Sequence, residues 1–156
     1  MRGPAWETFL GQPFEVGEMT FNASAISMGN PHVVLLVDED PERYHVGHIG
    51  PVLEHHELFP ERTNVEFVRT GTDGLRVRVW ERGVGETLGC GTGACAALVA
   101  ANEAGIAGTV ATVRFPGGSV RVERREDGEV VLTGPATHVF EGVIDLDRVR
   151  ATAARL

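Results

Sequence analysis

The stretch from Glu81 to Ala96 constrains the fold of this chain more than any other part of the sequence. A strand pattern ends there, a glycine-rich loop follows, and a helix of small residues begins. The spacing and composition predict this helix from about Gly91 to Glu103, rich in alanine, with Gly105 placed to end it. A helix this narrow fits inside a curved sheet, so strands are expected on both sides of it in the sequence.

Strand patterns occur on both sides of the helix. Hydrophobic alternation and turn residues predict strands at 14–16, 19–21, 32–37, 64–69, 75–81, 109–115, 119–125, 129–133 and 137–144. Residues 41–56 have helical spacing in part, and 145–156 are expected to form a short terminal helix. We therefore predict one domain over residues 1–156, of the α+β class: a curved, mostly antiparallel sheet or half-barrel wrapped around a central helix.

The composition restricts the class of partner. The chain has 22 acidic and 14 basic residues, for a net charge of −8, which argues against nucleic acid or an anionic membrane surface as partner. Its only cysteines are Cys90 and Cys95, so no disulfide framework is expected. No leader pattern opens the chain, and no apolar stretch approaches the roughly 20 residues of a membrane span. These features predict a cytoplasmic protein.

Cys90 is the strongest candidate for a reactive group. It stands at the expected start of the helix, between Gly89 and Gly91, where few neighbours cover it. The helix dipole and the free N–H groups of the first turn should lower the pKa of such a thiol. The same N–H groups can bind a carboxylate or a phosphate. Cys95 lies roughly 140° around the helix from Cys90 and is expected to belong to the core.

Other candidates flank this loop or precede a strand. Glu81 and Arg82 end a strand just before the glycines; Arg82 could bind a carboxylate, and Glu81 could orient an amine or exchange a proton with a thiol. Asn30 and His32 lie in a loop at the mouth of a buried strand. The histidines lack zinc-like ligand spacing, so no metal site is predicted.

Three motifs in order resemble the diaminopimelate epimerase family. They are Met28-Gly29-Asn30-Pro31-His32, Arg62-Thr63-Asn64-Val65-Glu66-Phe67-Val68, and the run from Glu81 to Ala94 that contains Cys90. The segments 115–118, 134–136 and 139–142 resemble the closing part of the same family. The resemblance implies an isomerase without pyridoxal phosphate or another cofactor. It would interconvert LL- and meso-diaminopimelate on the route to lysine and peptidoglycan, using one cysteine from each of two domains.

The resemblance also assigns roles to residues of this chain. Cys90 would be one catalytic acid/base, and His32 and Glu81 would tune the thiols. The substrate-binding residues would be Asn30, Asn64, Arg82, Gly91 and Thr92. The family's first cysteine motif has no match in this sequence, so the chain resembles the C-terminal half and is expected to be inactive alone. Its expected partners are a small amino-acid substrate and either a separate N-terminal half or a homodimer partner.

Three other functions remain open on the sequence. The first is a racemase of the same fold that acts on another amino acid, such as proline. The second is a Cys–His hydrolase with Cys90 as nucleophile, His32 as base and the helix N-terminus as oxyanion hole. The third is a non-catalytic domain that keeps the fold and binds a carboxylate ligand.

Overall fold

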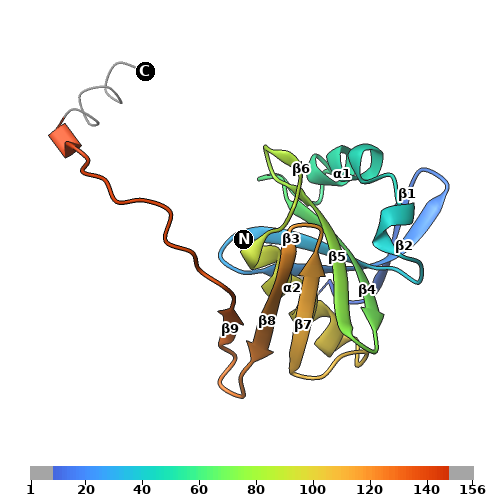
Figure 1. The fold of residues 1–156 in the computed structure, drawn as a ribbon. Helices are drawn as coiled ribbons and strands as arrows, with labels where there is room; N and C mark the ends of the chain where they lie inside the picture. Colours follow the sequence, from blue (N-terminus) through green and yellow to red (C-terminus); the bar gives the residue numbers. More distant parts are fainter. Residues whose placement is uncertain (1–8, 148–156) are drawn as a thin grey trace.

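A single mixed sheet organises the chain in the computed structural model, which describes residues 9–147 (Figure 1). Its strands run in the order β1-β2-β3-β4-β5-β7-β8-β9, and β6 pairs with β5. The strands are β1 (Gln12–Val16), β2 (Met19–Ser27), β3 (Pro31–Leu36), β4 (Asn64–Gly71), β5 (Gly74–Glu81), β6 (Gly85–Thr87), β7 (Val110–Phe115), β8 (Gly118–Arg124) and β9 (Val130–Thr133). The helices are the short 3-10 turn η1 (Pro41–Arg43), α1 (Val46–Glu54) and α2 (Gly91–Glu103).

Most neighbouring strands are antiparallel, as the sequence predicts, and tight turns join them. Gly17 and Glu18 turn β1 into β2, and Asp127 and Gly128 lie in the turn between β8 and β9. Two pairs are parallel: β3 with β4, and β5 with β7. Parallel neighbours require a long crossover connection, and here η1 with α1 and then α2 provide the two crossovers. Both helices are therefore placed by the sheet topology.

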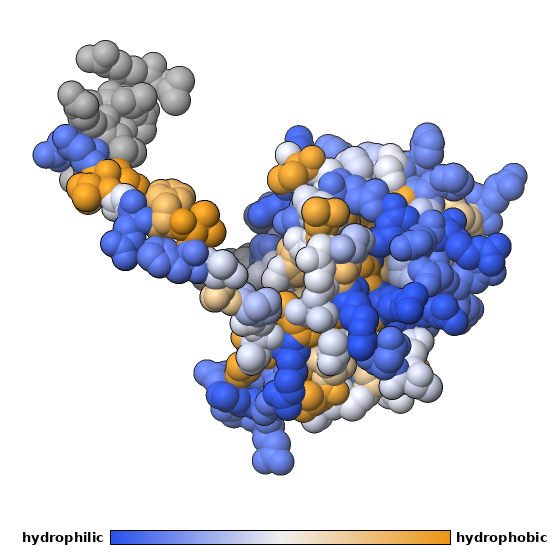
Figure 2. Space-filling view, in the orientation of Figure 1, coloured by the Kyte–Doolittle hydropathy of each residue, from blue (hydrophilic) through white to orange (hydrophobic). Residues whose placement is uncertain are grey.

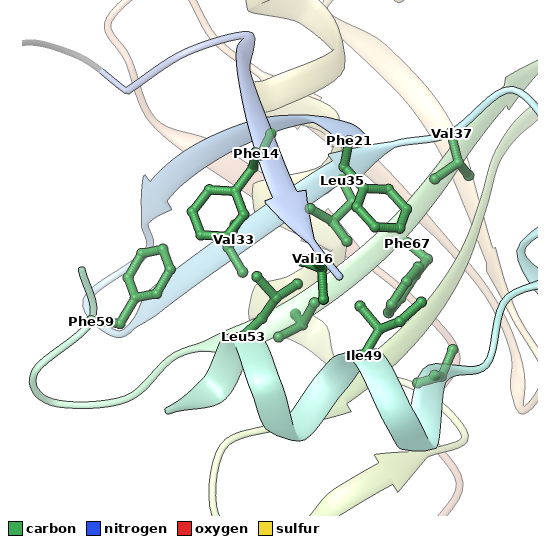
Figure 3. Packing of buried hydrophobic residues seen from close by; sticks show 13 residues of the cluster. Phe14, Val16, Phe21, Val33, Leu35, Val37, Ile49, Leu53, Phe59 and Phe67 are labelled. Carbon is green, nitrogen blue, oxygen red and sulfur yellow. The ribbon is translucent and has the colours of Figure 1, made fainter. Parts of the chain in front are cut away.

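The two helices cover opposite faces of the sheet and give the chain two hydrophobic clusters. In β3, Val33 and Leu35 belong to the cluster under α1, whereas Val34 belongs to the cluster around α2. All three are fully buried, which confirms the prediction of a strand buried on both faces. Figure 3 shows the first cluster, in which the ring of Phe67 lies above α1 and its Ile49.

Helix α2 lies within the curve of the strands, because its side chains are small. Its five fully buried alanines let strands from both halves of the sheet approach it: Ala94, Ala96, Ala97, Ala100 and Ala101. Cys90 caps the first turn, and Gly105 follows the last turn with a φ of 71°. This agrees with the predicted helix bounds and with the predicted small-residue packing. Neither α1 nor α2 combines the length and the apolar character that a membrane span requires.

Two predictions about strands are wrong. Residues 137–144 form no strand; this segment follows β9 and leads away from the sheet (Figure 1). Figure 2 shows apolar side chains on it, and Val139 and Phe140 are 83% and 81% exposed. A strand needs a hydrogen-bonding neighbour, and β9 is the last strand on that edge. Conversely, β6 was missed because three residues within a glycine-rich loop carry no alternation signal. Most of the expected terminal helix, 148–156, lies outside the described residues.

Candidate active site

Cys90 caps α2 through its own thiol. Its Sγ accepts a hydrogen bond from the N–H of Gly93 at 3.4 Å and lies 3.5 Å from Oγ1 of Thr92. Within residues 9–147, the N–H groups of Gly91 and Thr92 have no acceptor. Unpaired N–H groups in a first helical turn attract anions. The structure therefore places a half-buried thiol beside two donors that are open to a ligand.

The prediction of a lowered pKa for Cys90 is wrong. Burial raises the pKa of this thiol above its ordinary value of 9.0. The hydrogen bonds from Thr92 and Gly93 lower it, but the carboxylates of Glu81 and Glu66 raise it further. Loss of hydration and two nearby acidic groups thus outweigh the favourable position at the helix end. At neutral pH these effects favour the thiol of Cys90 over its thiolate.

An open cavity of about 380 Å³ borders Cys90. Its walls are the loop Leu88–Gly91, the turn between β7 and β8, and Pro135. The loop and the turn are joined by a hydrogen bond from the N–H of Gly117 to the carbonyl oxygen of Leu88, at 2.8 Å. A Cβ atom on Gly117 would lie 2.8 Å from that same oxygen, so only glycine permits this approach. This close contact between Gly117 and Leu88 holds the loop before Cys90 in place.

His32 is buried and does not contact the thiol directly. Its Nδ1 lies 2.6 Å from Oε1 of Glu66, and both side chains are 0% exposed. Its Nε2 lies 3.1 Å from Oδ1 of Asn30, whose Nδ2 donates to Oγ1 of Thr92 at 3.3 Å. The structure thus brings Asn30, His32 and Thr92 together beside Cys90. No hydrogen bond between His32 and Cys90 occurs in the described part of the chain, so His32 is not positioned as the base of a Cys–His hydrolase.

Glu66 is the residue of this cluster to which the sequence assigned no role. The segment 64–69 alternates, and such alternation places Glu66 on a solvated face. Instead β4 lies between β3 and β5, and α2 covers the face that carries Glu66. The available signal was an acidic residue within a strand whose flanking positions, Val65 and Phe67, are both apolar. Sequence alone could not distinguish a solvated face from one covered by a distant helix.

The side chain of Asn64 contacts the backbone of Arg82. Asn64 Oδ1 accepts a hydrogen bond from the Arg82 N–H at 2.9 Å, and its Nδ2 donates to the carbonyl of Pro31 at 2.9 Å. Asn64 is buried, so in this structure its amide ties β3 and β5 together. The exposed guanidinium of Arg82 donates to the carbonyl of Glu61 at 3.0 Å. Within the described part of the chain this is the one hydrogen bond of the guanidinium, so most of its donors are available to a ligand.

Two further carboxylates are held by neighbouring groups. Glu81 Oε1 accepts a hydrogen bond from the hydroxyl of Thr87, on β6, at 2.5 Å. Glu54, buried at the end of α1, accepts from Nε1 of Trp80 at 2.7 Å and from the N–H of Gly83 at 2.9 Å. Burial raises the pKa of Glu54, but these two bonds, together with the charges of His55 and Arg62, outweigh burial, and the pKa is lowered overall. Glu54 thereby anchors the turn that follows Glu81.

The second cysteine lies apart from the cavity. Cys95 is half-buried on α2 and packs against the cluster around that helix, as predicted. Burial raises the pKa of its thiol as well. Among residues 9–147, no group of three or more His, Cys, Asp or Glu side chains is arranged to bind a metal.

The family model and the curated relatives agree on one family. The family model described as diaminopimelate epimerase matches residues 24–139. A diaminopimelate epimerase of Synechococcus elongatus is 51% identical over 133 residues, which are 85% of this chain and 47% of that protein. One from Leptospira biflexa is 46% identical over 141 residues, or 90% of this chain and 50% of that protein. The chain thus spans about half the length of these curated relatives.

A solved structure of a Bacillus anthracis phenazine biosynthesis protein of the PhzF family is also similar, with 21% identity and a TM-score of 0.49. The match covers 72% of this chain and 38% of that one. Because the family model matches most of the sequence, including the cluster around Cys90, the chain belongs to the diaminopimelate epimerase family.

Proposed function

We propose that this chain forms one side of the active site of a cofactor-independent epimerase that interconverts LL- and meso-diaminopimelate. The observation that carries the proposal is the position of Cys90, in a member of this family, beside an open cavity and two unpaired helix N–H groups. A thiol can exchange a proton with the α-carbon, and the N–H groups can bind the α-carboxylate. The small-molecule partner is therefore an amino acid.

The chemistry requires an acid and a base on opposite faces of the α-carbon. In one direction a second group removes the α-proton, and Cys90 donates its S–H proton to the other face and becomes a thiolate. In the reverse direction Cys90 begins as the thiolate and accepts the proton. The N–H groups of Gly91 and Thr92 stabilise the negative charge that develops on the carboxylate. The raised pKa of Cys90 suits the direction in which it is the acid.

The second acid/base comes from a polypeptide segment other than residues 9–147. Cys95 cannot serve, because it packs against the core on the flank of α2. A separate N-terminal half or a second copy of the chain would supply the group, and closure of the two parts would complete the site. Arg82 and Asn64, with Asn30, would face the distal amino-acid end of the substrate. A cytoplasmic location would keep both free thiols reduced.

Exchange of the α-proton tests this function. The chain would replace the matching half of a curated relative, and the chimera would be incubated with LL-diaminopimelate in D₂O, with NMR detection of the α-proton. We expect exchange and inversion in the chimera, and neither with the chain alone. Cys90→Ala should abolish both, whereas the matched control Cys95→Ala should keep them. A folded chimera that leaves the α-proton unchanged, or equal exchange in the Cys90→Ala chimera, would overturn the proposal.

A further inference from the structure

Glu66 carries a carboxyl group in the interior of the protein, and His32 is its one side-chain hydrogen-bond partner among residues 9–147. The side chain is 0% exposed, and its Oε1 lies 2.6 Å from Nδ1 of His32. Its other oxygen, Oε2, is buried without a partner among the described residues. A buried, unpartnered carboxylate oxygen is costly, whereas the carbonyl oxygen of a neutral carboxyl group is much less so. Burial also raises the pKa of Glu66.

The contacts of His32 fix how many protons the pair of His32 and Glu66 holds. Oδ1 of Asn30 can only accept, so Nε2 of His32 must carry a hydrogen to bond to it at 3.1 Å. The contact between Nδ1 and Glu66 then holds one proton, and the pair is neutral overall wherever that proton resides. Removing it would leave an uncompensated charge in the core. Glu66 therefore keeps the His32 ring with its N–H directed at Asn30.

The donor-to-acceptor direction set at His32 continues through Asn30 and Thr92 to the thiol of Cys90. With its oxygen occupied by His32, Asn30 directs its Nδ2 to Oγ1 of Thr92, where it donates at 3.3 Å. The Thr92 oxygen thus accepts from Asn30, and its own hydrogen is available for Sγ of Cys90, 3.5 Å away. In this series of hydrogen bonds, the donor and acceptor roles of each group are set by the group before it. Glu66 is the buried end of this series of hydrogen bonds.

We propose that Glu66 is a positioning residue that acts through His32, Asn30 and Thr92 to hold the Thr92 hydroxyl as a hydrogen-bond donor to the Cys90 sulfur. A hydroxyl that donates to sulfur favours the thiolate over the thiol. Glu66 thereby partly offsets the burial of Cys90 and makes both of its protonation states accessible. This role rests on the proposed function, because it concerns the same thiol. The ionisation of Cys90 can nevertheless be measured without catalytic turnover.

Other charged groups near Cys90 must be separated from this effect. The acidic side chain of Glu81, on β5, raises the pKa of the thiol, and so does that of Glu66 itself, on β4. On α2, Cys95 is the other titrating group that interacts with Cys90. A substitution that removes the carboxyl group of Glu66 therefore changes the pKa of Cys90 both through this electrostatic effect and through the hydrogen bonds that lead to Thr92. Two substitutions that both remove the carboxyl group, but differ in hydrogen bonding to His32, isolate the role of this relay from Glu66 through His32 and Asn30 to Thr92.

Glu66→Gln and Glu66→Leu form this pair. The glutamine amide can donate to Nδ1 of His32 and keeps the ring direction, whereas leucine leaves Nδ1 without a partner. Both would be made in a Cys95→Ala chain, and the pKa of Cys90 would be read from the pH dependence of its alkylation by iodoacetamide. We expect the pKa in Glu66→Leu to exceed that in Glu66→Gln by about one unit. Equal values in two folded variants would overturn the proposal.

Thr92→Val provides the second test. In that background the difference between Glu66→Gln and Glu66→Leu should disappear, because the hydroxyl that carries the effect is absent. A difference that persists without the hydroxyl would contradict the relay. The unsubstituted chain gives a measurement that does not depend on Glu66→Leu folding: ¹⁵N NMR of the His32 ring should show a proton on Nε2 across the neutral range. A bare Nε2 would overturn the proposal, whatever the outcome of the epimerase assay.

Discussion

Replacing Gly93 by alanine would test how closely the first turn of α2 packs on the buried carboxyl of Glu66. A Cβ atom at this position would lie 2.8 Å from Oε1 of Glu66 and 3.2 Å from Cβ of Cys90. The first separation is too short for two non-bonded heavy atoms, so Glu66 would have to move. Its oxygen is held by His32, which is itself fully buried. The side chain of Glu66 therefore cannot move aside freely, and the substitution would strain the packing of Glu66 and His32 in the interior of the protein.

The expected loss of stability follows from three contributions. Alanine in a helix interior is favoured over glycine by about 1 kcal/mol. Overpacking a closely packed site costs about 1–3 kcal/mol. Displacing Oε1 would weaken its hydrogen bond to His32, at a further cost of about 1 kcal/mol. The free energy of unfolding of Gly93→Ala should therefore fall by about 2 kcal/mol, although the substitution favours the helix.

Urea unfolding followed by far-ultraviolet circular dichroism measures this change. Gly91→Ala is the matched control, because it lies in the same turn and its Cβ would meet only Leu132, at 3.8 Å. We expect the control to be as stable as the unsubstituted chain, or more stable by up to about 1 kcal/mol. A Gly93→Ala chain as stable as Gly91→Ala would refute the packing argument, because it would show that Glu66 has room to move.

Three further predictions address a buried anchor, a buried amide and the thiol. Glu54→Gln should lower the free energy of unfolding by about 1–3 kcal/mol at neutral pH, because the NH₂ group that replaces one carboxylate oxygen cannot accept a hydrogen bond from Trp80 or Gly83. The lowered pKa means that the contribution of the carboxylate is present above its unfolded value of 4.5 and is lost as the pH falls, so this difference should shrink in urea titrations in acid. Asn64→Asp should cost about 1–3 kcal/mol in the same assay, because the carbonyl of Pro31 loses its donor; an unchanged stability would contradict the tie between β3 and β5. In a Cys95→Ala chain, mass spectrometry should show the alkylation rate of Cys90 still rising beyond pH 9.0, and a plateau below that value would contradict the raised pKa.

The sequence predicted those parts of the fold that local patterns encode. The period-2 alternation located most of the strands, and the alanine content together with Gly105 located α2 at its observed bounds. These features depend on neighbouring residues, so a single sequence carries them. Residues 137–144 show the limit of such patterns: their composition suits a strand, but pairing requires a neighbour that the composition does not provide.

The candidate site divides in the same way. The sequence by itself determined that Cys90 begins a helix after a glycine-rich loop, since helix caps and glycine turns are local signals. Only the tertiary structure decided the surroundings of that thiol. The parallel pairing of β3 with β4 and the packing of α2 across them enclose Glu66 beside His32, 34 positions away in the chain. The same burial raises the pKa of Cys90, because removal of water from a charged group depends on atoms that are distant in sequence and close in space.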